Sequence, residues 1–525
     1  MKHKYDIPPL GGLNLELPPQ LIKRHFSPDL SGVWSINGQL ARIPGKQKFC
    51  DTLMSGAVMQ LFEFAVETGD KYLVAMTEDK AYWYNSATRT FDSIHDLTDF
   101  TGNADHPFSV VTFFDGTAKE IMIITNLIDA MRKWTGAGVI SALGGTPPQA
   151  NCLCVYENYL MCGHTTESGT LFPRRVRWSA LANGESYPAE NFADLRKTTD
   201  WVISLKLMRE RLAVYKEKSI SFMDHVGGGL TFDLVENYIN GVGAISDASV
   251  VAFGETQEAH YFIGSDLNVY EFDGIDHRVI EGVDTIIKNV NPDKKPRISG
   301  TADKEDHKVI WAIPSGTDET CRDLLIYDVR DHSWWVKEAE AIAVSSFGTA
   351  LLEETYTWDT LPFDTWEEWD DPGGWNSRNM LSNAPLILVG GADGYVRKLV
   401  GGVNDDGADL PSRYRYPFDN LDGSDDNLKL VNRVIIEVEN KGSGDIAFQV
   451  FTDHNDQNPA AIDEDGNTSA TIALSGTDSN AKFVYHSVDI AVEGYAFQWR
   501  LSSGNTAWSG RVIGIDYEIT GTRIL

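Results

Sequence analysis

The sequence predicts an all-β protein, a β-propeller of about seven four-stranded blades, with six possible, followed by a C-terminal β-sandwich. Three observations lead to this prediction. The 46 glycines and many short aromatic runs are typical of turns and strands rather than helices. Helical periodicity is scarce, because most apolar patterns alternate or end within about eight residues. One arrangement of strands and turns also recurs along the chain, which indicates a repeat architecture.

The recurring arrangement is an apolar strand, a polar turn, a strand with alternating aromatic residues, another turn and a last apolar strand. Large residues that alternate in this way fit a sheet packed on both faces. Copies begin at Leu73, Leu212, Tyr261, Val309 and Ile387. The strand that opens each unit precedes it, and the candidate starts are Val58, Val110, Ala150, Trp201, Ala248, Pro296 and Ala341. Their mean spacing is about 47 residues, within the roughly 40–50 residues of a propeller blade.

A ring of blades has to be closed, and the expected domain boundaries follow from that requirement. The segment from Val33 to Gly45 is predicted to supply a strand to the last blade, which removes two open sheet edges. We therefore expect an N-terminal arm and closing strand over 1–55 and a propeller over 56–402. A turn-rich linker is expected over 403–427, and six short alternating strands predict the sandwich over 428–525.

Composition argues against several classes of protein. The chain has 525 residues, of which 42% are hydrophobic, so it can build substantial cores and is not a disordered chain. Its 45 basic and 76 acidic residues give a net charge of −31, which disfavours a nucleic-acid-binding groove and docking on anionic lipid. Five cysteines are too few for a disulfide framework and fit a protein made in a reducing cytosol. The Pro- and Gly-rich N-terminus does not resemble a signal peptide, and no apolar run reaches the roughly 20 residues that cross a bilayer, so no membrane insertion is expected.

Common catalytic signatures do not occur in the sequence. It contains neither a G-x-S-x-G nucleophile elbow, nor an H-E-x-x-H zinc motif, nor a G-x-x-x-x-G-K-[ST] phosphate loop. We therefore expect a protein that is not an enzyme and needs no cofactor.

One cluster resembles a metal site, although no metal is expected on balance. Cys152, Cys154, Cys162 and His164 flank a predicted hairpin turn. If strand pairing is centred on Glu157, the three thiols and the imidazole share one face, which is a zinc-like set. A register shifted by one residue places them on opposite faces. Because free cysteine is among the most buried residue types, packing inside a blade is the favoured interpretation.

Two further sets of residues are predicted to contact a subunit or partner. Arg175 and Arg177 alternate on one strand face; they could clamp a phosphate or carboxylate, but pairing with acids of a neighbouring blade or subunit is favoured. The segment 353–383 interrupts the last repeat, and between Glu353 and Asp371 it carries eight acids and no Lys or Arg. Its indoles need a surface to bury against. The expected contact residues are Trp358, Trp366, Trp369, Asp364, Glu367 and Glu368.

Several phrases of the sequence resemble the β-propeller tail proteins of short-tailed phages, the packaged-DNA stabilisation, tail-nozzle or tail-hub family. The opening phrases are LGGLNLELPP from Leu10 and INGQLARIPG from Ile36. RVRWSALANGESY from Arg175 contains the family's Arg-x-x-Trp-Ser phrase. LAVYKEKSISFM, NGVGAISDASVVAFGE and YFIGSDLNVYEFDG then follow in the family's order. The likeness covers roughly residues 10–345 and weakens through the acidic insert.

This resemblance implies a structural virion protein that is made in the host cytoplasm and located in the phage tail. Such proteins form a homo-oligomeric ring, commonly a hexamer, below the adaptor and portal and next to tail fibre or spike proteins. The ring extends the DNA channel, retains the packaged genome and lets DNA pass without sequence specificity during ejection. The acidity of this chain agrees with that role, because an acidic wall repels DNA in a confined bore.

A second class of function stays open on the sequence alone. A propeller can bind or degrade glycans of the host surface, with the ligand at the mouth of its channel. The aromatic, acidic insert around Trp366 and Trp369 could stack on a sugar ring. A channel protein is expected to form a ring, whereas a glycan-degrading enzyme is expected to work as a monomer.

Overall fold

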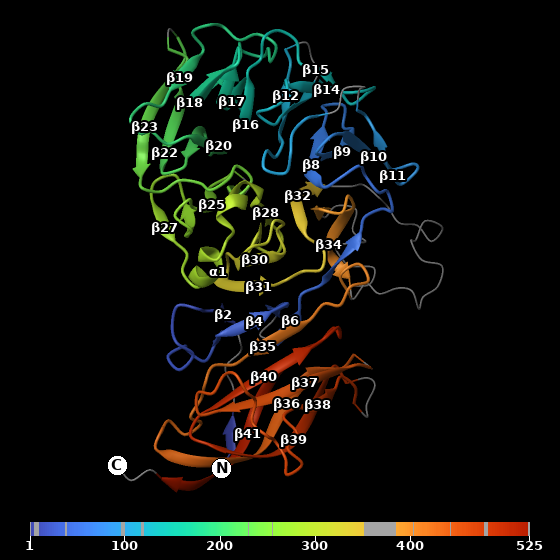
Figure 1. The fold of residues 1–525 in the computed structure, drawn as a ribbon, viewed down its shortest axis with the longest axis vertical. Helices are drawn as coiled ribbons and strands as arrows, with labels where there is room; N and C mark the ends of the chain where they lie inside the picture. Colours follow the sequence, from blue (N-terminus) through green and yellow to red (C-terminus); the bar gives the residue numbers. More distant parts are fainter. Residues whose placement is uncertain are drawn as a thin grey trace.

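Alternating apolar residues and tight turns give the chain short antiparallel strands, and these strands build two parts (Figure 1). The computed structural model describes residues 2–4, 10–36, 39–95, 100–116, 120–228, 230–254, 256–350, 385–402, 404–441, 443–476 and 481–522. Over these residues it contains a ring of seven blades and a β-sandwich, so the predicted all-β propeller with a C-terminal sandwich is confirmed and the blades number seven. In Figure 1 the ring occupies the upper part, while the sandwich and both ends of the chain lie below it.

Blades one to five are antiparallel sheets whose four strands follow the order of the chain. Their second strands are mostly buried on both faces, as expected for sheets that stand between two neighbours. Blade one consists of β8 (Val58–Ala65), β9 (Lys71–Thr77), β10 (Ala81–Asn85) and β11 (Thr90–Ser93). Blade two consists of β12 (Ser109–Phe114), β13 (Glu120–Thr125), β14 (Arg132–Trp134) and β15 (Ser141–Ala142). Blade three consists of β16 (Gln149–Tyr156), β17 (Tyr159–Glu167), β18 (Thr170–Trp178) and β19 (Phe192–Asp194).

The next two blades keep the same order of strands, and the helical elements follow them. Blade four consists of β20 (Val202–Met208), β21 (Arg211–Lys216), β22 (Ser219–His225) and β23 (Phe232–Asn240). Blade five consists of β24 (Val251–Phe253), β25 (Ala259–Ile263), β26 (Val269–Phe272) and β27 (His277–Val279). The short helix α1 (Asp284–Lys288) and the 3₁₀ helix η1 (Pro292–Arg297) connect blade five to blade six.

The last two blades take strands from the N-terminal segment. Blade six consists of β28 (Ser299–Asp303), β29 (Lys308–Ile313), β30 (Asp323–Asp328) and β31 (Ser333–Lys337), extended by β2 (Gly12–Leu13) and β3 (Phe26–Ser27) in parallel pairing. Blade seven consists of β32 (Val344–Ala350), β33 (Leu386–Gly391), β34 (Val396–Gly402) and β7 (Gly45–Lys48). The closing strand is therefore β7, which shares only Gly45 with the predicted segment 33–45. The N-terminal segment does close the ring, but the predicted residues for the closing strand are wrong. The strands inside that segment, β5 and β6, belong to the sandwich instead.

The sandwich packs two sheets against each other, and four of its strands also come from the N-terminal segment. The first sheet has the order β39 (Phe483–Gly494), β36 (Asn427–Glu439), β41 (Ser509–Thr522), β6 (Gln39–Arg42) and β5 (Val33–Ile36), with β1 (Lys2–Lys4) beside β41. The second sheet has the order β38 (Ala470–Ala473), β37 (Asp445–Thr452), β40 (Phe497–Ser503), β35 (Ser412–Arg415) and β4 (Asp29–Ser31). Because β35 lies within 403–427, the expectation of a mere linker there is wrong.

Apolar clusters between neighbouring blades hold the ring together. Val58 of blade one and Leu388 of blade seven share such a cluster, so the first and last blades are joined through their side chains as well as through β7. The largest cluster runs from blades five to seven into the sandwich and includes Trp311, Tyr414 and Trp499. Propeller and sandwich consequently share one continuous core.

Candidate functional site

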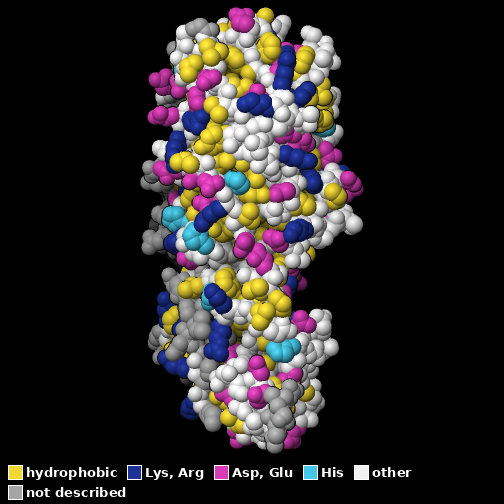
Figure 2. Space-filling view, turned by 90° about the vertical axis from the view of Figure 1, so that its left-hand side faces the viewer, with side chains coloured by type: hydrophobic (Ala, Val, Ile, Leu, Met, Phe, Trp, Pro, Cys, Tyr) yellow, Lys and Arg dark blue, Asp and Glu magenta, His cyan; other side chains and the backbone are white. Residues whose placement is uncertain are grey.

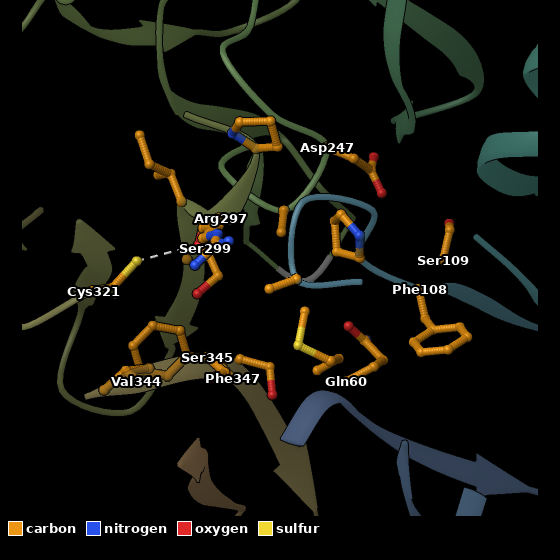
Figure 3. A pocket seen from close by; sticks show the side chains of 18 of the residues that line it. Gln60, Phe108, Ser109, Asp247, Arg297, Ser299, Cys321, Val344, Ser345 and Phe347 are labelled. Atoms are coloured by element: carbon orange, nitrogen blue, oxygen red, sulfur yellow. Dashed lines mark hydrogen bonds between the residues drawn. The ribbon is translucent and has the colours of Figure 1, made fainter. Parts of the chain in front are cut away.

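The first strand of each blade faces the axis of the ring, where the structure encloses a cavity of about 370 Å³ (Figure 3). Every blade contributes a residue from its first strand or directly beside it, namely Gln60, Ser109, Leu153, Lys206, Val250, Ser299 and Ser345. This volume lies at the lower end of the roughly 300–1,000 Å³ of small-ligand sites. A polynucleotide does not fit in it.

The strongest charges at this cavity are already paired. The Lys206 ammonium lies 3.2 Å from the Asp247 carboxylate, which also accepts a hydrogen bond from the Ser204 hydroxyl at 2.5 Å. Burial alone would lower the pKa of Lys206, but Asp247 outweighs burial and raises it. Arg297 donates to Asp105 at 2.6 Å and thereby lowers the pKa of that carboxyl. The cavity therefore presents ion pairs with little excess charge.

The opposite wall of the cavity is formed by blade six and the start of blade seven. Figure 3 shows Ser299, Arg297, Cys321 and Val344 there, across from Gln60 and Ser109. The Ser299 hydroxyl is buried and has no hydrogen-bond partner among the described residues. Burial raises the pKa of the Cys321 thiol to about 12, which makes it a poor nucleophile at neutral pH. This wall suits a small polar molecule or water better than covalent catalysis.

The turn between β16 and β17 determines on which face of the blade each residue of the predicted cysteine–histidine cluster lies. Glu157 and Asn158 both have positive φ, 50° and 57°, which is typical of the two-residue turn that suits twisted strands. Pairing is therefore centred between these two residues and not on Glu157. Cys152 consequently lies opposite Gly163 rather than opposite Cys162.

This register places the thiols on opposite faces of the blade, and the zinc-like arrangement does not form. Cys152 and Cys154 pack toward blade four, while Cys162 packs toward blade two. His164 sits at a bulge with positive φ, and its ring packs edge-on against Trp201 with centroids 5.4 Å apart. Burial raises the pKa of Cys154 and of Cys162 to about 12, which opposes the thiolate form that zinc requires.

Arg175 and Arg177 are held by acids of their own blade. Arg175 forms a two-pronged ion pair with Asp194, with distances of 2.7 and 3.1 Å, and this pairing raises its pKa. Arg177 lies 3.0 Å from Glu167, and the Arg175 guanidinium also stacks over the Phe192 ring at 4.0 Å. All five residues belong to blade three. The two arginines therefore pair within their own blade, and not with a neighbouring blade or subunit as expected. Their side chains are only 11% and 13% exposed.

The remaining predicted contact residues lie in the segment 351–384, outside the described residues. They are Trp358, Trp366, Trp369, Asp364, Glu367 and Glu368. Their role as partner contacts stays a prediction.

A buried group of charges, which the sequence did not single out, lies where the ring closes. We call Lys46, Lys337, Glu340 and Asp405 the closure cluster. Both lysines form ion pairs with Glu340, and their ammonium groups lie 3.4 and 3.6 Å from Asp405. All four side chains are at most 2% exposed. Burial favours a protonated Asp405, but the two lysines outweigh it and lower its pKa.

The closure cluster joins three separate segments of the chain. Lys46 comes from the closing strand β7, and Lys337 ends β31 in blade six. Glu340 lies between blades six and seven, and Asp405 lies between blade seven and the sandwich. Lys337 and Glu340 are only three residues apart, whereas Lys46 and Asp405 reach them only after the ring has closed.

The described part of the chain offers neither a ready metal site nor a membrane-spanning helix. No group of three or more His, Cys, Asp or Glu side chains within it has the geometry of a metal site. No helix within it is long and apolar enough to cross a membrane.

Comparisons with known proteins give distant likenesses. No family model and no curated protein matches the chain. Among solved structures, BamB from Moraxella catarrhalis is 9% identical with a TM-score of 0.34, over 70% of this chain and 93% of that one. PorZ, an essential bacterial surface component of the type-IX secretion system of Porphyromonas gingivalis, is 10% identical with a TM-score of 0.33. That likeness covers 68% of this chain and 38% of PorZ.

Proposed function

We propose that this chain is a structural protein of a phage tail. In this proposal, copies of the chain form a ring, a hexamer by resemblance, below the portal and adaptor. The ring extends the DNA channel, retains the packaged genome and lets DNA through on ejection. The chain performs no catalysis in this role.

The observation that carries the proposal is the way the N-terminal segment interlocks the propeller and the sandwich. The N-terminal segment gives strands to blade six, to blade seven and to both sheets of the sandwich. The closure cluster and a core shared by propeller and sandwich reinforce these pairings. Strand pairings and buried contacts at so many points suit a protein that bears load within an assembly.

Charge and size support a channel built between copies rather than within one propeller. The axial cavity is far too small for DNA and its ion pairs are balanced, whereas the whole chain carries −31. The acidic excess therefore lies elsewhere on the chain. If that surface lines the bore of a ring, it repels the phosphate backbone and prevents DNA from sticking during passage.

The outer strands of blades three to five offer a surface for packing between copies. Phe192, Val235, Tyr238 and Val279 lie on β19, β23 and β27 and are each 36–44% exposed. Figure 2 shows this side of the molecule, where apolar side chains reach the surface among acidic and basic ones. Exposed apolar groups rimmed by charges are typical of protein–protein contacts.

The experiment that tests the proposal is electron microscopy of phage particles that contain this chain. We expect an annulus of this protein on the tail axis, directly below the neck, and particles lacking the protein should lose their DNA. Antibody labelling of an inserted epitope identifies the chain within the density. A protein absent from the particle, or one that purifies as a monomer with turnover on host polysaccharide, would falsify the proposal.

A further inference from the structure

The axial cavity lies toward one end of the ring. Besides the first strands, its lining comes from connections between blades and from turns between second and third strands. In an antiparallel blade these connections and turns lie at the same end of the strands. Pro107 and Asp247 belong to the connections, before β12 and β24. Glu78 and Thr320 belong to the turns, after β9 and before β30. Loops and strands at this end therefore build the cavity together.

Charge at this cavity is balanced. Three cations and three acids line it or pair with a residue of its lining, namely Lys206, Arg297, Lys294, Glu78, Asp105 and Asp247. Each cation is held by an acid, Lys206 by Asp247 and the other two by Asp105. A carboxylate or phosphate of a ligand would therefore have to compete with these acids for a cation, which disfavours anions and zwitterions.

Several polar groups of the lining have hydrogen-bonding capacity that the described residues leave unused. Three hydroxyls make no hydrogen bond to any described residue, those of Ser299, Thr320 and Ser345. The Ser109 hydroxyl accepts from the Leu153 amide at 3.0 Å, and its own proton has no acceptor in the described part of the chain. The Glu78 carboxylate likewise has no partner there. Ser299 is only 6% exposed, so its hydroxyl requires a water molecule or a ligand.

The same cavity has apolar walls between these polar groups. Phe108 and Phe347 line it, and so do Met59, Leu153 and Val250. Figure 3 shows Phe108 next to Ser109, so an aromatic ring and a hydroxyl lie side by side. Ligand pockets of this kind combine apolar contact with a few polar groups that fix the orientation of the ligand.

The size and chemistry of the cavity select one class of ligand. Its volume of about 370 Å³ equals roughly a dozen water molecules at ~30 Å³ each, which is room for one small molecule. The balanced charge favours a neutral molecule, and the unused hydroxyls and carboxylate favour one that carries several hydroxyls. The apolar walls favour C–H groups on the same molecule. A sugar ring or a similar cyclic polyol has all of these properties.

We propose that the axial cavity binds a neutral, polyhydroxylated molecule of monosaccharide size. The Glu78 carboxylate accepts hydrogen bonds from hydroxyls of the ligand, the Ser299 and Ser345 hydroxyls bond further ones, and the aromatic walls contact its C–H groups. The ligand is bound and not turned over. This inference concerns a single chain and does not depend on the role in a phage tail, so the test below uses the isolated protein.

The test is saturation-transfer NMR of the full chain with the methyl glycosides of glucose, galactose, mannose and N-acetylglucosamine, each titrated to tens of millimolar. At least one should bind saturably. Ser345→Leu fills the cavity and should abolish this binding. Ser299→Ala should weaken it about three- to tenfold through the loss of one hydrogen bond, and Glu78→Gln by about tenfold or more. The matched control is Ser141→Leu on the exposed strand β15, which should keep wild-type affinity to within about twofold.

Two further measurements complete the design. Urea unfolding of each variant shows that the fold is kept, and Ser299→Ala removes a hydroxyl without a partner among the described residues, so it should be as stable as wild type. Maltotriose distinguishes the two sources of such a ligand. Binding of maltotriose together with methyl glucoside identifies the end of a glycan chain, and binding of methyl glycosides alone identifies a free sugar.

Four results would overturn the proposal. The first is the absence of saturable binding by any of these sugars, which would mean that the cavity holds water alone. The second is equal binding by wild type and Ser345→Leu, which would place the site elsewhere. The third is an equal loss in Ser141→Leu, which would mean attraction without a site. The fourth is binding of acetate or tetramethylammonium that Ser345→Leu abolishes while no sugar binds, which would make the cavity a site for a charged ligand.

Discussion

Replacing Lys46 by methionine should destabilise the closed ring, because it removes one cation from the fully buried closure cluster. Lys46 bonds Glu340, lies 3.4 Å from Asp405 and donates to the Ile342 carbonyl at 2.9 Å. With Lys46→Met, two buried carboxylates are left with Lys337 alone. The variant keeps the length and apolar stem of the side chain, so the change isolates the charge.

The size of the effect follows from the burial of the four side chains. Removing one partner from a buried ion pair leaves an uncompensated charge and costs about 3–5 kcal/mol. If the free energy of unfolding falls by about 3 kcal/mol per M urea, this loss lowers the unfolding midpoint by about 1–1.7 M. The double variant Lys46→Met/Glu340→Gln removes a cation and an anion together and leaves Lys337 with Asp405. It should recover most of the loss, because a balanced pair remains.

The assay is equilibrium unfolding in urea, followed by tryptophan fluorescence. Trp334 and Trp335 lie buried on β31, the strand that ends with Lys337, and report on this part of the ring. Arg433→Gln breaks an exposed pair with Asp489 and should leave the midpoint unchanged. The reasoning is refuted if Lys46→Met behaves like this surface control, or if the double variant is less stable than the single one.

Three further predictions concern closure, pH and thiols. Gly45→Ala should cost about 2 kcal/mol or more in urea unfolding, because an added Cβ would lie 1.9 Å from the Asn404 carbonyl oxygen; an unchanged midpoint would show that β7 can shift freely. Burial lowers the pKa of His260 to about 4 from an ordinary 6.5, so His260 stays neutral in the folded protein while the unfolded chain takes up a proton. Stability should therefore fall by about 3 kcal/mol as the pH drops from 6.5 to 4, and His260→Gln should flatten this part of the pH profile measured by urea midpoints. Of the five free cysteines, only Cys50 is not buried. A colorimetric thiol assay should thus detect no more than one thiol in the native protein and all five in urea, and two or more reactive native thiols would contradict the packing described for blade three.

The sequence was sufficient to predict the architecture, because each blade repeats the same local pattern. The predicted starts at Val58, Val110 and Ala150 fall on or next to the first residues of β8, β12 and β16. Alternation and turn residues are local properties, and they survive divergence between blades. The closing strand was harder to predict, because segments 33–45 and 45–48 both alternate and only their distant partners decide which sheet each one joins.

The candidate sites were less predictable, since they depend on register and on contacts between distant segments. The cysteine cluster depended on whether the turn held one or two residues, and positive φ at both Glu157 and Asn158 decided it. The partners of Arg175 were expected across a blade or subunit boundary, yet Asp194 lies on the adjacent strand of the same blade.

The order of strands has a consequence for how the molecule folds. β7 pairs with β34, and β4 pairs with β35. Both N-terminal strands therefore pair with strands more than 300 residues later in the chain. Loop-closure entropy makes such pairings slow, so ring closure comes after the blades are formed. The sandwich is completed by the same N-terminal segment, through β4, β5 and β6. Closing the propeller and completing the sandwich are therefore one coupled step. Asp405, which lies between the two parts, pairs with the buried Lys46 and Lys337 in that step.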